Sequence, residues 1–186
     1  QTAPMNYPLS EHNSDGLLVF TDSLDEAEII RLHDAQFPLV LLHRSSPPGL
    51  NIPCVTVENK SGARRLVDYL IEERGCRRIA FLAGPDGQED SFWREMGYRE
   101  SLTAHGIGFD PSLVATGGFD EHVAKTGIQT LLERGVKMDA IFTGDDDSAI
   151  GVLAHLKETG IRVPEDIAVV GFDDIPLARH LTPPLT

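Results

Sequence analysis

Polar and aromatic side chains directly follow most of the apolar runs in this sequence. They occur in Phe20-Thr21-Asp22, His43-Arg44, Pro85 to Arg94, Phe119-Asp120, Asp145-Asp146-Asp147 and Phe172-Asp173-Asp174. Carboxylates accept hydrogen bonds from hydroxyl groups, an arginine donates a fork of hydrogen bonds, and aromatic faces stack on ligand rings. A fold that brings these side chains to one cleft would suit a polyol or a sugar.

Several of these residues also have a purely structural interpretation. One aspartate of the acidic run, most simply Asp146, can cap the helix that follows it. Asp173 and Asp174 can belong to an ordinary turn. Phe119 can be a packing residue, and Arg94 can form a surface ion pair with a neighbouring glutamate. The spacing alone leaves these alternatives open.

Signatures of catalysis and metal binding are weak. The sequence lacks GxSxG, GxxxxGK[ST], HExxH and GxGxxG motifs, and its histidines include no HxxxH pair. Cys54 and Cys76 have no zinc-ligand spacing, and we expect both to be reduced. One enzymatic alternative is a metal-dependent hydrolase that holds Mg²⁺ at residues 145–147. Because a phosphate cradle is absent, we instead predict a binding protein without catalytic residues, metal or cofactor.

Short, continuous apolar runs alternate with helical patterns, and these elements must position the polar side chains. The runs are typical of parallel-sheet strands buried on both faces, and they cover 15–20, 38–43, 54–57, 77–84, 139–144 and 166–173. Helical patterns cover 25–35, 59–74, 92–105, 121–134 and 147–159. This alternation predicts an α/β, doubly wound fold whose strand ends form the ligand-binding edge.

Composition and charge exclude some functions. The 186 residues carry 16 Lys and Arg against 29 Asp and Glu, a net charge of −13. This charge repels a phosphate backbone, so we expect any DNA contact to come from elsewhere. We see no membrane span or signal peptide and expect a cytoplasmic protein without membrane contact. The short polar start and the stop after Pro183-Pro184 lead us to expect a fragment.

In chain order, these segments resemble the LacI/GalR family of bacterial transcription regulators, whose core is similar to periplasmic sugar-binding proteins. The resemblance covers nearly the whole chain. Its most specific text is DIAVVGFDD at 166–174, followed about ten residues later by PPLT at 183–186. Further matches are DGLLVF (15–20), PLVLLHR (38–44), VTVENKSGARRLVDYLIEERGCRRIAFLAGP (55–85), SFWREMGYRESLTAHGI (91–107) and DAIFTGDDDSAIGVLAHLKETG (139–160).

The resemblance implies a periplasmic binding protein type I-like fold, with two doubly wound parallel-sheet subdomains flanking a cleft. Residues 1–57 would be the remainder of the N-terminal effector-binding subdomain, 58–178 the C-terminal subdomain, and 179–186 the start of a return crossover. The family's helix-turn-helix headpiece, which contacts DNA, would lie outside this sequence, together with a first strand–helix–strand unit. The N-terminal part of the fold would therefore be truncated.

The resemblance also implies roles for single residues. Arg94 matches an arginine that grips the effector, Phe119 an aromatic residue that stacks on it, and Asp173 a carboxylate that accepts its hydrogen bonds. Asp145 stands where the family commonly has asparagine, so we expect it to be a ligand contact. Asp146 is then the expected helix cap.

Residues of the first subdomain complete the predicted site. His43 stands where the family usually has aspartate, and this departure, like that at Asp145, leaves the ligand unidentified. Phe20 and Thr21 would line the same side of the cleft. The resulting hypothesis is an effector-sensing domain of a homodimeric regulator, in which a sugar-like molecule shifts an open–closed equilibrium and thereby operator binding. The alternative is a sugar-binding protein of a transport system.

Overall fold

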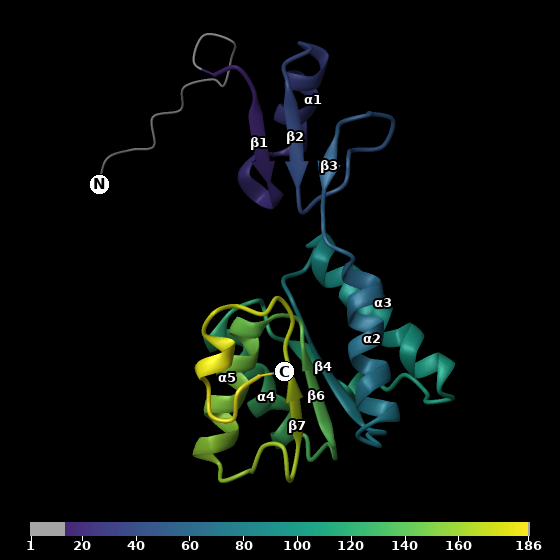
Figure 1. Cartoon of the computed structure of the whole chain (residues 1–186), viewed down its shortest axis with the longest axis vertical. Coiled ribbons are helices and arrows are strands. Elements are labelled where there is room, and N and C mark those ends of the chain that lie inside the picture. The colour runs from purple at the N-terminus through teal and green to yellow at the C-terminus, as the bar shows by residue number, and fades with distance from the viewer. Residues whose placement is uncertain (1–13, 186) are drawn as a thin grey trace, which may run out of the picture. The chain divides into compact units, whose positions relative to one another are not determined.

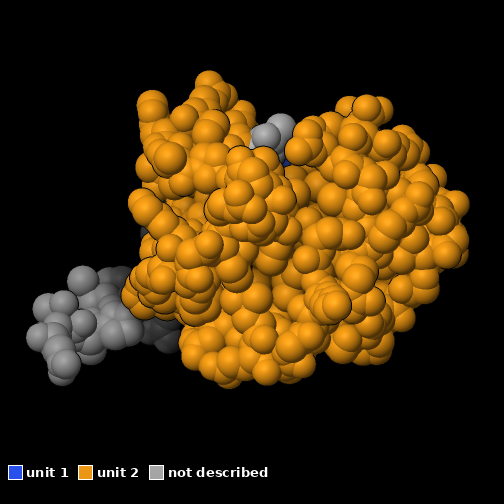
Figure 2. Space-filling view, turned by 90° about the horizontal axis from the view of Figure 1, so that it is seen from below, with its two compact units in different colours: residues 1–57 blue, residues 58–186 orange. Residues whose placement is uncertain are grey.

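The computed structural model describes residues 14–185. The chain divides into two compact units between Val57 and Glu58, and Figure 2 colours them separately. We call the residues up to Val57 unit 1 and those from Glu58 onward unit 2. Both units consist of parallel strands and helices, so the predicted α/β class is confirmed. The assignment of the units as effector-binding subdomains, with 179–186 as a return crossover, stays a prediction.

Unit 1 is a three-stranded parallel sheet with one described α-helix. The hydrogen-bonded order is β1 (Leu17–Phe20), β2 (Leu39–Leu42) and β3 (Cys54–Val55), and α1 (Glu26–Asp34) follows β1 (Figure 1). Val19 and Leu41 pack with α1 residues in its core. Leu18 and Val55, by contrast, are 73% and 61% exposed. The prediction of strands buried on both faces is therefore wrong for β1 and β3, because α1 covers one face only.

Unit 2 is a four-stranded parallel sheet with helices on both faces. The strand order is β5 (Val114–Thr116), β4 (Ile79–Ala83), β6 (Ala140–Thr143) and β7 (Ala168–Val170). Phe81 and Phe142 share a core with α2 (Asn59–Glu72) and α3 (Glu89–Ala104). Leu82 and Ile141, the sequence neighbours of these two residues, share a second core with α4 (Glu121–Glu133) and α5 (Asp146–Glu158). This alternation is the predicted double winding.

Two elements of unit 2 differ from the sequence prediction. Strand β5 was not predicted, because its three residues are too short a run to stand out from a loop. Helix α3 begins at Glu89, three residues before the predicted start at 92, because its first turn is polar and shows no apolar periodicity. Three short 3₁₀ segments complete the described chain, at Thr21–Ser23, Pro111–Leu113 and Ala178–His180. No helix in residues 14–185 is long and apolar enough to cross a membrane.

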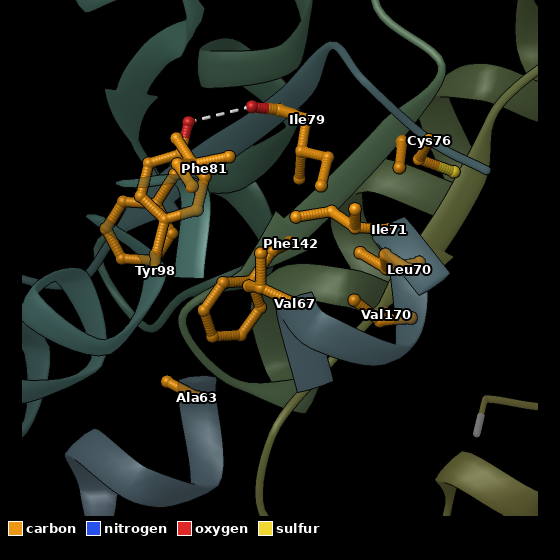
Figure 3. Close-up of a cluster of buried hydrophobic side chains, with 12 residues drawn as sticks. Ala63, Val67, Leu70, Ile71, Cys76, Ile79, Phe81, Tyr98, Phe142 and Val170 are labelled. Carbon is orange, nitrogen blue, oxygen red and sulfur yellow. Dashed lines mark hydrogen bonds between the residues drawn. The ribbon is translucent and has the colours of Figure 1, made fainter. Parts of the chain in front are cut away.

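Tyr98 anchors α3 to the sheet. Its side chain is fully buried, its ring stacks on Phe81 with centroids 5.3 Å apart, and its hydroxyl donates to the carbonyl oxygen of Ile79 at 2.8 Å (Figure 3). Burial raises the pKa of this phenol, so it remains a donor at all physiological pH values. We expect Tyr98→Phe to lower the free energy of unfolding by about 1 kcal/mol in urea denaturation. The half-exposed Tyr69 offers a matched control, and an equal loss in Tyr69→Phe would contradict this assignment.

His105, the residue after α3, links this helix to α2. Its Nε2 lies 3.0 Å from Glu72 Oε1, and its Nδ1 lies 2.8 Å from the carbonyl oxygen of Ser101 and 3.6 Å from Asp68 Oδ1. The Glu72 hydrogen bond, followed by that to Ser101, raises the pKa of His105 above 6.5. The contact therefore stabilises the fold fully below about pH 6.5, and this contribution is lost as pH rises through the folded-state pKa.

We therefore expect a pH-dependent difference between the wild-type chain and His105→Gln. The Tm of the wild type should fall toward that of the variant as the pH rises from about 6 to about 8. Thermal melts at constant ionic strength measure the difference. Parallel Tm curves for the two proteins across this range would contradict the prediction.

Candidate ligand-binding site

Arg94 lies at the centre of a polar cluster at the carboxyl edge of the unit 2 sheet. Its side chain is buried, and its Nε donates to Asn59 Oδ1 at 2.9 Å. One terminal nitrogen donates to the carbonyl oxygen of Gly144 at 2.6 Å and the other to Asp173 Oδ1 at 3.1 Å. The guanidinium carbon lies 4.0 Å from the ring centroid of Phe172. The Arg94 guanidinium is thus held by α2, by the residue after β6 and by the loop after β7. The alternative that Arg94 forms only a surface ion pair with a neighbouring glutamate is therefore wrong.

The close approach of α2 and α3 places Arg94 there. Gly97 lies one turn after Arg94, and a Cβ atom at Gly97 would lie 2.2 Å from the carbonyl oxygen of Lys60 on α2. Only glycine permits this separation of the two helices. Residues three apart lie on the same face of a helix, so Arg94 faces the first turn of α2 as well. The contact between Arg94 and Asn59 follows from this packing.

The helix-capping role predicted for Asp146 belongs to Asp145 in the structure, and the predicted ligand contact of Asp145 stays a prediction. Asp145 is the N-cap of α5, since its carboxylate accepts from the backbone N–H of Ser148 at 3.0 Å. The Asp146 carboxylate instead accepts from the backbone N–H of Ile175 at 2.9 Å and also from those of Phe172 and Asp174. The prediction that Asp146 caps the helix is therefore wrong. The physical reason is that the chain after β7 folds back over α5 and presents its amide groups to Asp146.

The hydrogen bonds from backbone amides to the Asp146 carboxylate shape the loop that carries Asp173. Asp173 and Asp174 have backbone φ values of 110° and 56°. Residues other than glycine and asparagine rarely adopt such positive values. The amide groups bound by Asp146 hold the loop in this conformation and direct Asp173 toward Arg94. The loop at Asp173 and Asp174 thus also brings a carboxylate to Arg94.

The carboxylates near Arg94 form an electronegative, acceptor-rich surface. Burial raises the pKa of Asp145, Asp146 and Asp173. The positive charge of Arg94 opposes the shift at Asp173 and Asp145, whereas the neighbouring carboxylates add to it. The carboxylates of Asp145 and Asp173 thus lie near the Arg94 guanidinium, whereas that of Asp146 is held by backbone amides of the loop after β7.

Phe119 packs against Gly84, which follows β4, and Gly144, which follows β6. A Cβ atom at Gly84 would lie 2.4 Å from its ring, and one at Gly144 would lie 2.8 Å from it. The ring centroid is 5.3 Å from the guanidinium carbon of Arg94, and the residue has a left-handed φ of 53°. Phe119 therefore lies in the Arg94 cluster while half-buried, and its role in stacking on a ligand stays a prediction.

Phe20, Thr21 and His43 lie together at the carboxyl ends of β1 and β2 in unit 1. The rings of Phe20 and His43 stack with centroids 5.4 Å apart, and the Thr21 hydroxyl donates to the carbonyl oxygen of His43 at 3.0 Å. His43 has a left-handed φ of 56°. The seven predicted site residues thus form two groups, this one in unit 1 and the Arg94 cluster in unit 2.

Sequence reasoning did not identify Asn59 or Asp90 as parts of the cluster. Asn59 is the first residue of α2, and its Nδ2 donates to Asp90 Oδ1 at 2.7 Å. An asparagine in the first turn of a helix that follows shortly after a strand was the available signal. Within the described residues, no group of three or more His, Cys, Asp and Glu side chains is arranged to hold a metal ion. The acidic run does not converge on one point, since Asp145 and Asp146 bind different backbone groups and Asp147 is exposed.

The chain is similar to known proteins over most of its length. A family profile described as a periplasmic binding protein-like domain matches residues 67–186. The transcriptional regulator CelR of Thermobifida fusca is 36% identical over 96% of this chain and 52% of its own length. The transcriptional repressor CytR of Escherichia coli is 34% identical over 92% of this chain and 50% of its own. The chain thus spans about half the length of these curated relatives.

Solved structures agree with this likeness. A complex of CelR with cellobiose matches with a TM-score of 0.84 and 37% identity over 94% of this chain and 54% of that one. A sugar-binding LacI-family regulator from Escherichia coli, complexed with phosphate, matches with a TM-score of 0.82 and 34% identity over 92% and 61%. The fold is that of a periplasmic-binding-protein-like domain. The chain belongs to the LacI family of transcriptional regulators.

Proposed function

We propose that this chain is the effector-sensing region of a DNA-binding regulator and that its effector is a small, neutral, hydroxyl-rich molecule such as a sugar. The observation that carries the proposal is the buried Arg94 guanidinium with the carboxylates of Asp145 and Asp173 beside it. A fixed donor beside several acceptors matches neighbouring hydroxyl groups, each of which can donate and accept. Two of the similar proteins are described as bound to cellobiose or as sugar-binding, which supports the same class.

The charges favour a neutral sugar over a phosphorylated one. Asp173 already balances the single positive charge of Arg94, and Asp145 adds a further carboxylate. A phosphate group carries roughly 1.5 to 2 negative charges at neutral pH and would meet like charges in this cluster. We infer a binding protein rather than an enzyme, since the relatives that the chain matches are transcriptional regulators.

The regulatory step in this proposal is a shift between two arrangements of units 1 and 2. An effector that binds one arrangement more tightly increases its population. A homodimer would convert the shift into a change in operator affinity, and a helix-turn-helix outside this chain would make the DNA contact. The net charge of −13 supports placing that contact elsewhere.

A thermal-shift and calorimetric screen tests the proposal. The panel contains cellobiose, other neutral mono- and disaccharides, polyols, nucleosides and the matching sugar phosphates. A neutral sugar at 100 times its Kd should stabilise the chain by about 2.7 kcal/mol, whereas its phosphate should give a much smaller shift. The ligand found should also change operator affinity of the longer, headpiece-containing protein. Stabilisation by sugar phosphates alone, or by no member of the panel, would overturn the proposed ligand class.

A further inference from the structure

Asn59 lies between Arg94 and Asp90 and is one of the buried polar side chains of residues 14–185. It is 3% exposed, its Oδ1 accepts from Arg94 Nε at 2.9 Å, and its Nδ2 donates to Asp90 Oδ1 at 2.7 Å. The two neighbours make opposite demands, because the arginine needs an acceptor and the aspartate needs a donor. A carboxamide meets both demands with one planar group.

We propose that Asn59 is a positioning residue that sets the orientation of the Arg94 guanidinium, with Asp90 fixing which way the Asn59 amide points. A guanidinium is planar, so the direction of its Nε–H bond also fixes its two terminal nitrogens. With Nε held by α2, those nitrogens reach the Gly144 carbonyl and Asp173 at the edge of the sheet. Asn59 thus acts on the effector through Arg94.

Asn59 also keeps Asp90 from pairing with Arg94. If Asp90 paired directly with the Nε–H bond, it would add a further acidic group to Asp173 and Asp145, and the guanidinium would lose the donor strength that a hydroxyl-rich ligand requires. The neutral Asn59 amide orients the Arg94 guanidinium without adding a charge next to it. Aspartate at position 59 would instead place two carboxylates within hydrogen-bond distance, where both cannot stay ionised.

The first test needs no effector. The Nε–H signal of Arg94 in a ¹⁵N–¹H spectrum is identified by its loss in Arg94→Lys, and its exchange with solvent is measured in the full chain. We expect Asn59→Ala to accelerate this exchange by about tenfold or more. Gln129→Ala, which removes an exposed amide on α4, should leave the exchange unchanged. Equal exchange in Asn59→Ala and wild type would overturn the proposal, whether or not any sugar binds.

An exchange of the two side chains separates positioning from general damage to the fold. Asn59→Asp alone should weaken binding of a neutral sugar from the screen by about tenfold and make it dependent on pH near neutrality, because the two carboxylates share a proton. Combining Asn59→Asp with Asp90→Asn restores one donor and one acceptor between the side chains. Affinity should then recover in part, because the orientation is restored while a carboxylate remains beside Arg94, and the pH dependence should be removed.

The affinity readout rests on the proposed function, and the exchange readout does not. If the wild-type chain binds no sugar, the ligand class fails while the exchange of the Arg94 Nε–H still tests the role of Asn59. If sugars bind and the double variant is as weak as Asn59→Asp, with a native spectrum in both, the positioning role is wrong.

Discussion

We expect replacement of Arg94 with alanine to abolish sugar-induced stabilisation and to weaken the fold of unit 2. The variant leaves the Gly144 carbonyl, Asn59 Oδ1 and Asp173 without their donor. Hydrogen bonds that involve a charged partner contribute about 1.5–3 kcal/mol each, and the half-exposed Asp173 recovers part of its loss from water. We therefore expect the free energy of unfolding to fall by about 2–3 kcal/mol. At a sugar concentration that stabilises the wild type by about 2.7 kcal/mol, the variant should show no shift.

Arg99→Ala is the matched control, because Arg99 lies on the same helix and is half-exposed. It pairs with Glu95 at 2.6 Å and lies over the Phe109 ring, contacts that contribute at most about 1 kcal/mol at a surface. Sugar binding should be intact in this variant. Arg94→Ala that still shows the full sugar shift would place the ligand outside the Arg94 cluster.

The sequence predicts the unit 2 sheet well because its strands are covered on both faces. Residues such as Phe81 and Leu82 face opposite cores, so apolar runs are continuous and easy to recognise. The same pattern was misleading in unit 1, where Leu18 is apolar yet exposed. A run of apolar residues shows which faces of a strand could be buried. It does not show which of these faces another element of the described chain covers.

Site residues that follow strand ends can be predicted from the sequence, whereas those whose role depends on distant partners cannot. Arg94 and Asp173 follow from strand ends and family resemblance, and the structure joins them although 79 positions separate them. The choice between Asp145 and Asp146 depends on whether a distant loop offers amide groups, which the preceding strand and following helix cannot reveal. Asn59 was missed for the same reason, since its partners on α3 lie more than 30 positions away.

The second large effect is expected from Gly97→Ala, which tests how helix packing positions the site. In an isolated helix this change would add about 1 kcal/mol of stability, because alanine has the higher helix propensity. Here the added Cβ atom would lie 2.2 Å from the carbonyl oxygen of Lys60 and 2.9 Å from the backbone nitrogen of Arg64. Both atoms belong to the backbone of α2, so no side chain can rotate away. The two helices must separate.

Separation of α2 from α3 moves Arg94 away from Asn59, so stability and binding should change together. We expect Gly97→Ala to lower the free energy of unfolding by about 2 kcal/mol, opposite in sign to the propensity effect, and to weaken sugar binding by about tenfold. Urea denaturation and calorimetry measure the two effects. Thr103→Ala, on the exposed face of α3, should change stability by less than about 0.5 kcal/mol and leave binding intact. A Gly97→Ala variant more stable than wild type would mean that the helices tolerate a wider separation, and the position of Arg94 would then need another explanation.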